Sequence, residues 1–547
     1  MAESPRIVDG LGLEELKSLL VQALEETARQ RTELADQRED NARLKAENAE
    51  LRDEIARLKG LNGRPKIKPS GMETATQTPS KGPRRKGRRG SRRAKLTIDE
   101  TRDIKVESLP TGARFKGYEE FVVQDLIIKP VTVLYKRERW QLPDGTTVVA
   151  PLPAGITTHF GPDLKRFVLA QYHQGQTTAP RLHGLLQELG IVISKRQLMR
   201  LLIDKKGAFL GEADAVLRTG LATASWITVD DTGARHKAKN GVCTQIGNDQ
   251  FASFTTTGSK SRLNFLELLG AGDTTHLINE AATTYMREHQ LAHGVIARLA
   301  SHATRRFADR GAWTRHLEAL GITALGVLPD PVRVATEGAL WGSIHAQGLL
   351  DDTVIVSDGA GQFDVGLHGA CWVHAERLVH KLDAFTSDRL AAKEAIRDRI
   401  WTLYADLKAY AVAPTPEAKT ELATRFDAIF TTKTCFVTLD RLLKRLHAKK
   451  ADLLMVLERP ATPLHTNGSE RDIRAQVTRR KVSGGTRSDA GRDCRDAFLG
   501  LRQTCAKQGV RFWDYLGARL AVPGVVAVPL LPALIGARHI PPRLDRT

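Results

Sequence analysis

Cysteine is scarce and dispersed in this chain of 547 residues. The five cysteines, at positions 243, 371, 435, 494 and 505, include no pair at the CxxC spacing. This pattern excludes a zinc knuckle and a disulfide framework, and it is typical of a protein kept in a reducing cytoplasm. We therefore expect no structural zinc and a cytoplasmic location.

The sequence also lacks an unbroken apolar segment that could cross a membrane. The apolar stretch from Leu520 to Ala537 contains Pro523, Pro529 and Pro532, and proline breaks a membrane helix. Acidic residues interrupt the apolar stretches of the first 30 residues, so no signal peptide is predicted. We expect no membrane partner.

Negative charge is in short supply. The chain has 82 Lys and Arg against 63 Asp and Glu, which gives a formal net charge of +19. Such an excess favours a polyanion such as DNA or RNA, because each neutralised phosphate releases counterions. An anionic membrane surface is the other class of partner that this charge suits. The length allows about two to four domains.

A heptad repeat runs from Leu13 to Leu58, with apolar ends and a more polar middle. Asn41 and Asn48 fall at a positions, where asparagine selects a paired, in-register arrangement. We expect a coiled coil over residues 1–60 and a homodimer or higher oligomer formed through it. The alternative is a single charged helix that lies on the protein.

Residues 61–98 are rich in Gly, Pro, Ser and Thr, and the segment 81–95 holds nine basic residues and no acid. This composition predicts a disordered basic linker. The linker either enters a DNA minor groove, contacts phosphates only, or is a solvated connection.

Residues 104–150 alternate apolar and polar side chains, with a turn at Pro143-Asp144-Gly145. This pattern predicts a few short strands, and so a small β-rich module over residues 99–155.

Residues 156–224 are expected to be helical and to bind DNA. One helix is predicted over 178–190, and Ser194 can cap a second one over 195–202. Two short helices split by a glycine turn make a helix-turn-helix candidate, although such pairs are also common in protein cores. The residues expected to contact DNA here are Lys195, Arg196 and Arg200.

Two apolar runs each lead to an acid. The run 226–229 precedes Asp230, and the run 353–357 precedes Asp358. We expect each run to form a buried strand with its acid at the strand's end.

A third acid opens a basic segment. Ser469 can cap a helix, and Glu470 falls in its first turn, where a carboxylate suits the helix dipole. From 471 to 487 there are six basic residues and one acid, Asp472. A carboxylate set in a positive surface suits an enzyme that holds a metal ion against a polyanion. The alternative is a capped helix with a solvated basic face.

Four motifs in this order resemble the insertion sequence 66 family of bacterial transposases. They are VDDTG (229–233), SDGAGQF (357–363), CWVHAER (371–377) and NGSERDIR (467–474), the last followed by RRK and SDAG. The resemblance covers roughly residues 150–520. It implies an α/β fold with a ribonuclease-H-like mixed-sheet catalytic core and helical insertions over residues 225–520, followed by a Pro-rich tail at 521–547.

The resemblance also implies a DDE enzyme in which Asp230, Asp358 and Glu470 are the catalytic acids and hold two Mg²⁺ (or Mn²⁺) ions. The predicted β-β-β-α order, with strands over 242–254 and a helix over 261–269, fits the start of such a core. Neighbouring acids are rivals for these roles, and the family's acid-Thr pair after the first acid favours Asp230. The rivals are Asp231, Asp351, Asp352 and Asp364.

Basic and aromatic residues near the acids have expected roles as well. Trp372 either stacks on DNA or packs in the core, and His374 either contacts phosphate, assists proton movement, or is a core histidine. A basic set is expected to hold backbone phosphates; its members are Arg471, Arg474, Arg479, Arg480 and Lys481.

The chain departs from the family pattern in three places. It has His465-Thr466-Asn467 where the family usually has Asp-Asn-Asn, and it lacks the paired cysteines usual before position 243. The interval between the first two acids is long, and we expect a helical insertion over 272–345. A second helical block is expected over 385–458, and a closing helix over 493–508.

We therefore expect a transposase that binds the terminal repeats of its element and target double-stranded DNA, at the bacterial nucleoid, and that catalyses metal-dependent strand cleavage and strand transfer. The departures leave two alternatives. One is a catalytically inactive or domesticated DNA-binding protein of the same fold, and the other is a metal-dependent structure-specific nuclease.

Overall fold

The computed structural model describes residues 27, 98–108, 110–153, 156 and 158–539. Residues 369–465 form one compact unit, here called the insert unit. The described residues of 73–368 and 466–547 form the other, the core unit. The predicted coiled coil and nearly all of the predicted basic linker lie outside the described residues.

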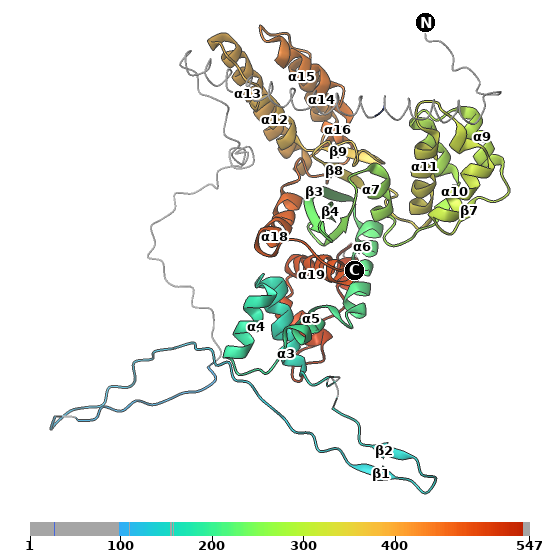
Figure 1. Cartoon of the computed structure of the whole chain (residues 1–547). Coiled ribbons are helices and arrows are strands. Elements are labelled where there is room, and N and C mark those ends of the chain that lie inside the picture. Colours follow the sequence, from blue (N-terminus) through green and yellow to red (C-terminus); the bar gives the residue numbers. More distant parts are fainter. Residues whose placement is uncertain (1–26, 28–97, 109, 154–155, 157, 540–547) are drawn as a thin grey trace, which may run out of the picture. The chain divides into compact units, whose positions relative to one another are not determined.

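A five-stranded mixed sheet is the centre of the core unit, with the strand order β5-β4-β3-β8-β9 (Figure 1). β3 (Trp226–His236), β4 (Lys239–Gly247) and β5 (Ala252–Thr257) are antiparallel neighbours. β8 (Val354–Ser357) runs parallel to β3, and β9 (Leu367–Ala370) contains the boundary between the two units. The fold is therefore mixed α/β, as expected.

β3 is longer than the sequence pattern indicates. The strand continues past Asp230 to His236, so Asp230 lies within the strand and not at its end. The extension has a local cause: Lys237 and Ala238 adopt positive φ angles of 48° and 61°, which suits the tight turn of a two-residue hairpin between β3 and β4. Asp358, in contrast, directly follows β8 as expected.

Helices cover the sheet and bury its apolar side chains. α7 (Arg262–Leu269) follows β5 and is capped by Ser261, which completes the predicted β-β-β-α order. Figure 1 shows the red helices α18 (Asn467–Ser483) and α19 (Asp489–Lys507) beside the green strands, and α18 contacts β3 while α19 contacts β5. α19 approaches β5 closely, since a Cβ at Gly500 would lie 2.8 Å from the carbonyl oxygen of Ala252.

The C-terminal segment adds to the same core. α20 (Phe512–Arg519) is followed by α21 (Leu531–His539), which packs on α6 (Gly207–Thr223). Leu531 and Ile535 are buried, so part of the segment described as a Pro-rich tail is a core helix.

The region before the sheet contains the two predicted short helices. α4 (Ala179–Glu188) and α5 (Lys195–Ile203) are in contact, and Ser194 forms a capping box with Gln197 at the start of α5. They are preceded by α3 (Pro162–Leu169) and by η1 (Ala170–Gln174), a π-helical turn. Of the short strands expected over 104–150, two are found, β1 (Arg139–Gln141) and β2 (Thr147–Val149), which pair across the predicted turn.

The interval 272–345 forms the helical insertion that we expected, with a core of its own around Trp313. Trp341 of its last helix also packs into the main core. Its elements are β6 (His276–Leu277), α8 (Glu280–Glu288), α9 (His293–Ser301), β7 (Arg306–Phe307), α10 (Arg310–Ala319), η2 (Ile322–Ala324) and α11 (Pro331–Ala346).

The insert unit is mostly helical, and its central block forms helices as expected. Trp372 is fully buried in it, donates a hydrogen bond from Nε1 to the carbonyl oxygen of Leu453 at 2.7 Å, and lies against Tyr404 and Phe426. Trp372 therefore packs in a core. The helices are α12 (Trp372–His380), α13 (Ser387–Val412), α14 (Pro416–Phe430), α15 (Val437–His447), α16 (Lys450–Leu453) and α17 (Met455–Glu458). Across the described parts of both units, no helix is long and apolar enough to span a membrane.

Candidate active site

The pairing of β3 with β8 brings two of the predicted acids to the same level. Trp226 is paired with Val354, and Thr228 with Val356, in parallel register. Asp230 and Asp358 each come two residues after this last pair. Because neighbouring strands are about 4.8 Å apart, the register places the two acids side by side.

α18 brings the third acid to the same strand. The hydroxyl of Ser469 donates a hydrogen bond to Oγ1 of Thr228 at 2.5 Å, and both side chains are buried. Thr228 and Asp230 are two residues apart and so face the same side of the sheet. Glu470 directly follows Ser469, in the first turn of α18.

Ser469 therefore has a different role from the one predicted. α18 begins at Asn467 with Thr466 as its N-cap residue, and Ser469 lies inside the first turn. Its hydroxyl bonds to the sheet, where it cannot serve as a cap.

Asp230 experiences the charges of its neighbours. Burial raises the pKa of Asp230, and the negative charges of Asp358, Asp231 and Glu470 raise it further. The backbone N–H of Asp231 donates to Oδ1 of Asp230 at 2.7 Å and opposes the shift. The resulting pKa is about 6, against an ordinary value of 3.8. Asp358 and Glu470 are thus both close enough to Asp230 to raise its pKa.

Asp231, the nearest rival, is held differently. It faces the opposite side of β3 from Asp230, and its two carboxylate oxygens accept from Nζ of Lys260 at 2.8 Å and from Nε2 of Gln362 at 2.9 Å. An acid whose charge is already matched by a lysine is a poorer ligand for a cation. The geometry favours Asp230 over Asp231 for that role.

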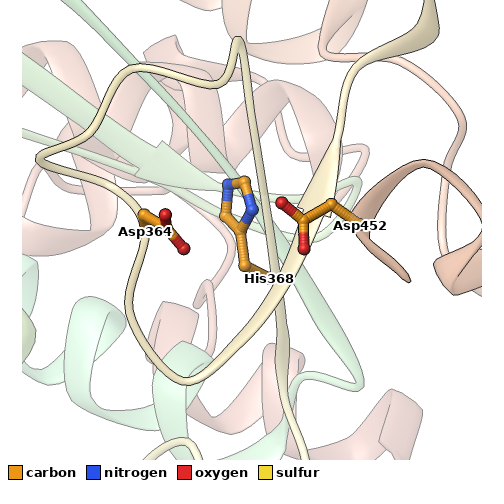
Figure 2. A group of neighbouring side chains, drawn as sticks. All are labelled: Asp364, His368 and Asp452. Carbon is orange, nitrogen blue, oxygen red and sulfur yellow. The ribbon is translucent and has the colours of Figure 1, made fainter. Parts of the chain in front are cut away.

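The other rivals come before and after β8 in the chain. Asp351 and Asp352 are exposed and precede β8. Asp364 is exposed on the loop that leads to His368 of β9, and Figure 2 shows both side chains. The ring of His368 shares a hydrogen bond with Oγ of Ser357 at 2.8 Å. Asp452, also drawn there, belongs to the insert unit.

Comparison with known proteins bears on the same segments. The model of the transposase IS66 family matches residues 340–493. A protein of Sinorhizobium fredii (strain NBRC 101917 / NGR234), described as uncharacterized protein y4jO, is 47% identical over 323 residues, which are all of that protein and 59% of this chain. The chain belongs to the IS66 transposase family. The matched region includes Asp358 and Glu470 of this family member, whereas Asp230 lies before it.

The basic residues of α18 in this IS66 protein fall into two groups. Arg471, Arg474 and Lys481 are exposed. Arg480 is half-buried and donates to the carbonyl oxygen of Gly233. Arg479 is only 5% exposed; it donates to the carbonyl oxygen of Tyr172 at 2.8 Å and lies over the Tyr172 ring at 3.8 Å. Arg479 therefore joins α18 to η1 and does not face solvent.

The remaining predicted residues lie on other elements. Lys195, Arg196 and Arg200 are all exposed on α5, and Arg200 is 3.9 Å from Asp204. His374 is half-buried on α12.

The residues that sequence reasoning missed are those that organise the acids. Thr228 and Ser469 join α18 to β3. Lys260 forms an ion pair with Asp231, and Gln362 donates a hydrogen bond to it. Gln362 and Ser469 belong to the motifs SDGAGQF and NGSERDIR, so their place there, as polar residues, could have indicated a role near the acids. Lys260 lies outside the motifs, and no feature of the neighbouring sequence indicates its contact with Asp231.

The donor set fits a divalent metal ion. Carboxylate oxygens are the ligands that Mg²⁺ and Mn²⁺ prefer. The charged groups that raise the pKa of Asp230 are all carboxylates, so a bound cation would relieve their repulsion. Asp230, Asp358 and Glu470 are the residues that would hold it.

Proposed function

We propose that this IS66 family protein is a DDE transposase, which binds the ends of its element and catalyses metal-dependent DNA strand cleavage and strand transfer. Its acids would be Asp230, Asp358 and Glu470. The observation that carries the proposal is the placement of these three carboxylates: Asp230 is on β3, Asp358 follows the adjacent parallel strand β8, and Glu470 is on a helix that is bonded to β3.

The sheet supports a ribonuclease-H-like core for this activity. β3, β4 and β5 are consecutive in the chain and antiparallel to their neighbours. β8 comes later in the chain and lies on the other side of β3, parallel to it. Such an arrangement lets acids that are far apart in sequence meet beside one strand. The hairpin with β4 holds β3 in place, and the parallel pairing of β8 with β3 then places Asp358 beside Asp230.

In the proposed reaction, water attacks a phosphodiester at the element end, and the P–O bond to the leaving strand breaks to give a 3′ hydroxyl. That hydroxyl then attacks a target phosphodiester, so one P–O bond forms as another breaks. Asp230, Asp358 and Glu470 would hold divalent ions there, which would supply charge stabilisation at the scissile phosphate and activation of the attacking oxygen. Asp230 must be ionised to act as a ligand, and Arg471, Arg474 and Lys481 would position the DNA backbone.

The exposed basic face of α5 is proposed as a further DNA contact. Lys195, Arg196 and Arg200 occur on one short helix whose apolar side, Leu198 and Leu202, is buried. Phosphate contacts from such a face would add affinity and orient the DNA.

Strand transfer on DNA that carries the inverted repeats flanking this gene tests the proposal. We expect Mg²⁺-dependent joining of an element end to target DNA by the full chain. Asp230→Asn and Glu470→Gln should lower the rate by about a thousandfold or more, because each tenfold corresponds to about 1.4 kcal/mol and a metal ion supplies several. Asp351→Asn, an exposed acid before β8, is the matched control and should keep the wild-type rate.

The same assay separates the alternatives. Cleavage without joining would indicate a nuclease. Repeat-specific binding with no cleavage by the wild type would indicate an inactive DNA-binding protein, and equal rates in the wild type and Asp230→Asn would disprove the assignment of the acids.

A further inference from the structure

A small, partly open cavity lies in the core unit where η1, α18 and α19 meet. Its walls include five polar side chains. They are His173, Gln176, Gln476, Arg479 and Arg495. The space admits a water molecule or a slightly larger particle. None of these residues belongs to the group of acids beside β3, so the cavity is a separate feature of the fold.

Several polar atoms of these walls lack a partner among the residues that the structure describes. Nη2 of Arg479, Nε and Nη2 of Arg495 and both amide atoms of Gln476 form no hydrogen bond with any residue that the structure describes. Nε2 of His173 and Oε1 of Gln176 likewise form no hydrogen bond with any described residue. Arg479 and Arg495 are only 5% and 6% exposed. A buried donor without an acceptor destabilises a fold, most of all when it is charged, so an occupant of the cavity is expected.

The charge around the cavity indicates which occupant it is. The walls that the structure describes contain two guanidinium groups and no carboxylate. Asp496 lies 3.6 Å from Arg495 and offsets one of the two charges. Arg479 bonds to an uncharged carbonyl oxygen. Burial, and after it the charges of Arg479 and Lys206, lower the pKa of His173 well below its usual value, so the ring of His173 is neutral and adds no negative charge to the site.

We propose that this cavity binds a small monovalent anion such as chloride, held by N–H groups of Arg479, Arg495 and Gln476. The amide of Gln476 can turn either atom toward the occupant, since the two ends have the same shape. Water would fill the same space but would leave the charge of Arg479 unmatched. The anion would join α18, which carries Glu470, to η1 and α19, and it would do so whether or not the protein is a transposase.

Two measurements on the full chain test the site. The first is the anomalous signal of chloride in crystals grown with sodium chloride, collected at long wavelength. We expect a peak within hydrogen-bonding distance of Arg479 and Arg495. Density at this place without an anomalous peak would identify water and overturn the proposal.

The second measurement is the melting temperature in sodium chloride and in sodium gluconate at equal ionic strength. We expect a saturable rise that is specific to chloride, because a ligand of the folded state alone stabilises it. Arg495→Met should abolish the rise, and Arg492→Met, on the same helix but outside the cavity, should keep it. An equal rise in both salts, or the same response in both variants, would contradict the site; the crystallographic measurement decides the matter if Arg495→Met does not fold.

Discussion

Neutralising Asp230 should make the metal-free protein more stable while it removes the activity. The amide introduced by Asp230→Asn would keep the shape of the side chain and an oxygen for the backbone N–H of Asp231. The substitution would remove a buried negative charge that lies among three other carboxylates. We therefore expect Asp230→Asn to raise the free energy of unfolding in the absence of metal.

The magnitude follows from the pKa of Asp230, which is about 6 in the folded state against an ordinary 3.8. Since the folded-state pKa is the higher one, the unfolded chain releases this proton first as pH rises, and folding is penalised at high pH. The difference of about two units corresponds to about 3 kcal/mol at pH 8. The penalty falls to about 1.5 kcal/mol at pH 5 and disappears below the unfolded value.

Urea unfolding of both proteins with a chelator, at pH 8 and at pH 5, measures this difference. The variant should be more stable by about 3 kcal/mol at pH 8 and by about half of that at pH 5. Addition of Mg²⁺ should stabilise the wild type more than the variant and narrow the gap, since the ion offsets the same repulsion. Asp351→Asn should change stability by less than about 0.5 kcal/mol at either pH.

Two results would refute the reasoning. The first is a variant no more stable than the wild type at pH 8, which would mean that the ionised carboxylate of Asp230 does not destabilise the folded protein. The second is an equal gain at both pH values, which would mean that the gain does not come from the charge.

Three further outcomes are expected. Ser469→Ala should cost about 1 kcal/mol in urea unfolding and raise the Mg²⁺ concentration for half-maximal strand transfer, because Glu470 loses its anchor on β3; Thr478→Ala, on the exposed face of α18, should change neither. Glu212→Gln should lower the free energy of unfolding by about 3 kcal/mol, because the buried carboxylate of Glu212 binds Arg519 and Tyr515 and the backbone of Leu531; an unchanged midpoint would mean that α21 does not depend on this contact. Replacing Lys195, Arg196 and Arg200 by Gln should lower the slope of log K against log salt for DNA binding by about one for each lost phosphate contact, and an unchanged slope would remove α5 from the DNA interface.

Local signals in the sequence were enough to predict much of the catalytic region. The apolar runs before Asp230 and Asp358 form β3 and β8. Ser194 caps α5 as predicted, and the helix expected over 261–269 forms α7. These features depend on residues within a few positions of each other. The candidate acids were found in the same way, because each one stands in a short motif.

Features set by distant contacts were missed. Ser469 binds Thr228, 241 positions away, where the sequence predicts a helix cap. α21 forms within a stretch with several prolines because its apolar side chains are buried against α6. In each case the partner that decides the structure is not visible in the local pattern.

The run of basic residues on α18 shows why charge alone is a poor guide to an interface. In the sequence, Arg471, Arg474, Arg479, Arg480 and Lys481 look equivalent. On a helix with 3.6 residues per turn, however, the positions 472, 476 and 479 share one side, and the structure buries all three. Arg479 is therefore directed to the interior, toward Tyr172 and the cavity. The exposed side carries Arg471, Arg474 and Lys481, so fewer positive charges are available for DNA than the sequence suggests. Arg479 and Arg480 instead bind α18 to the rest of the core.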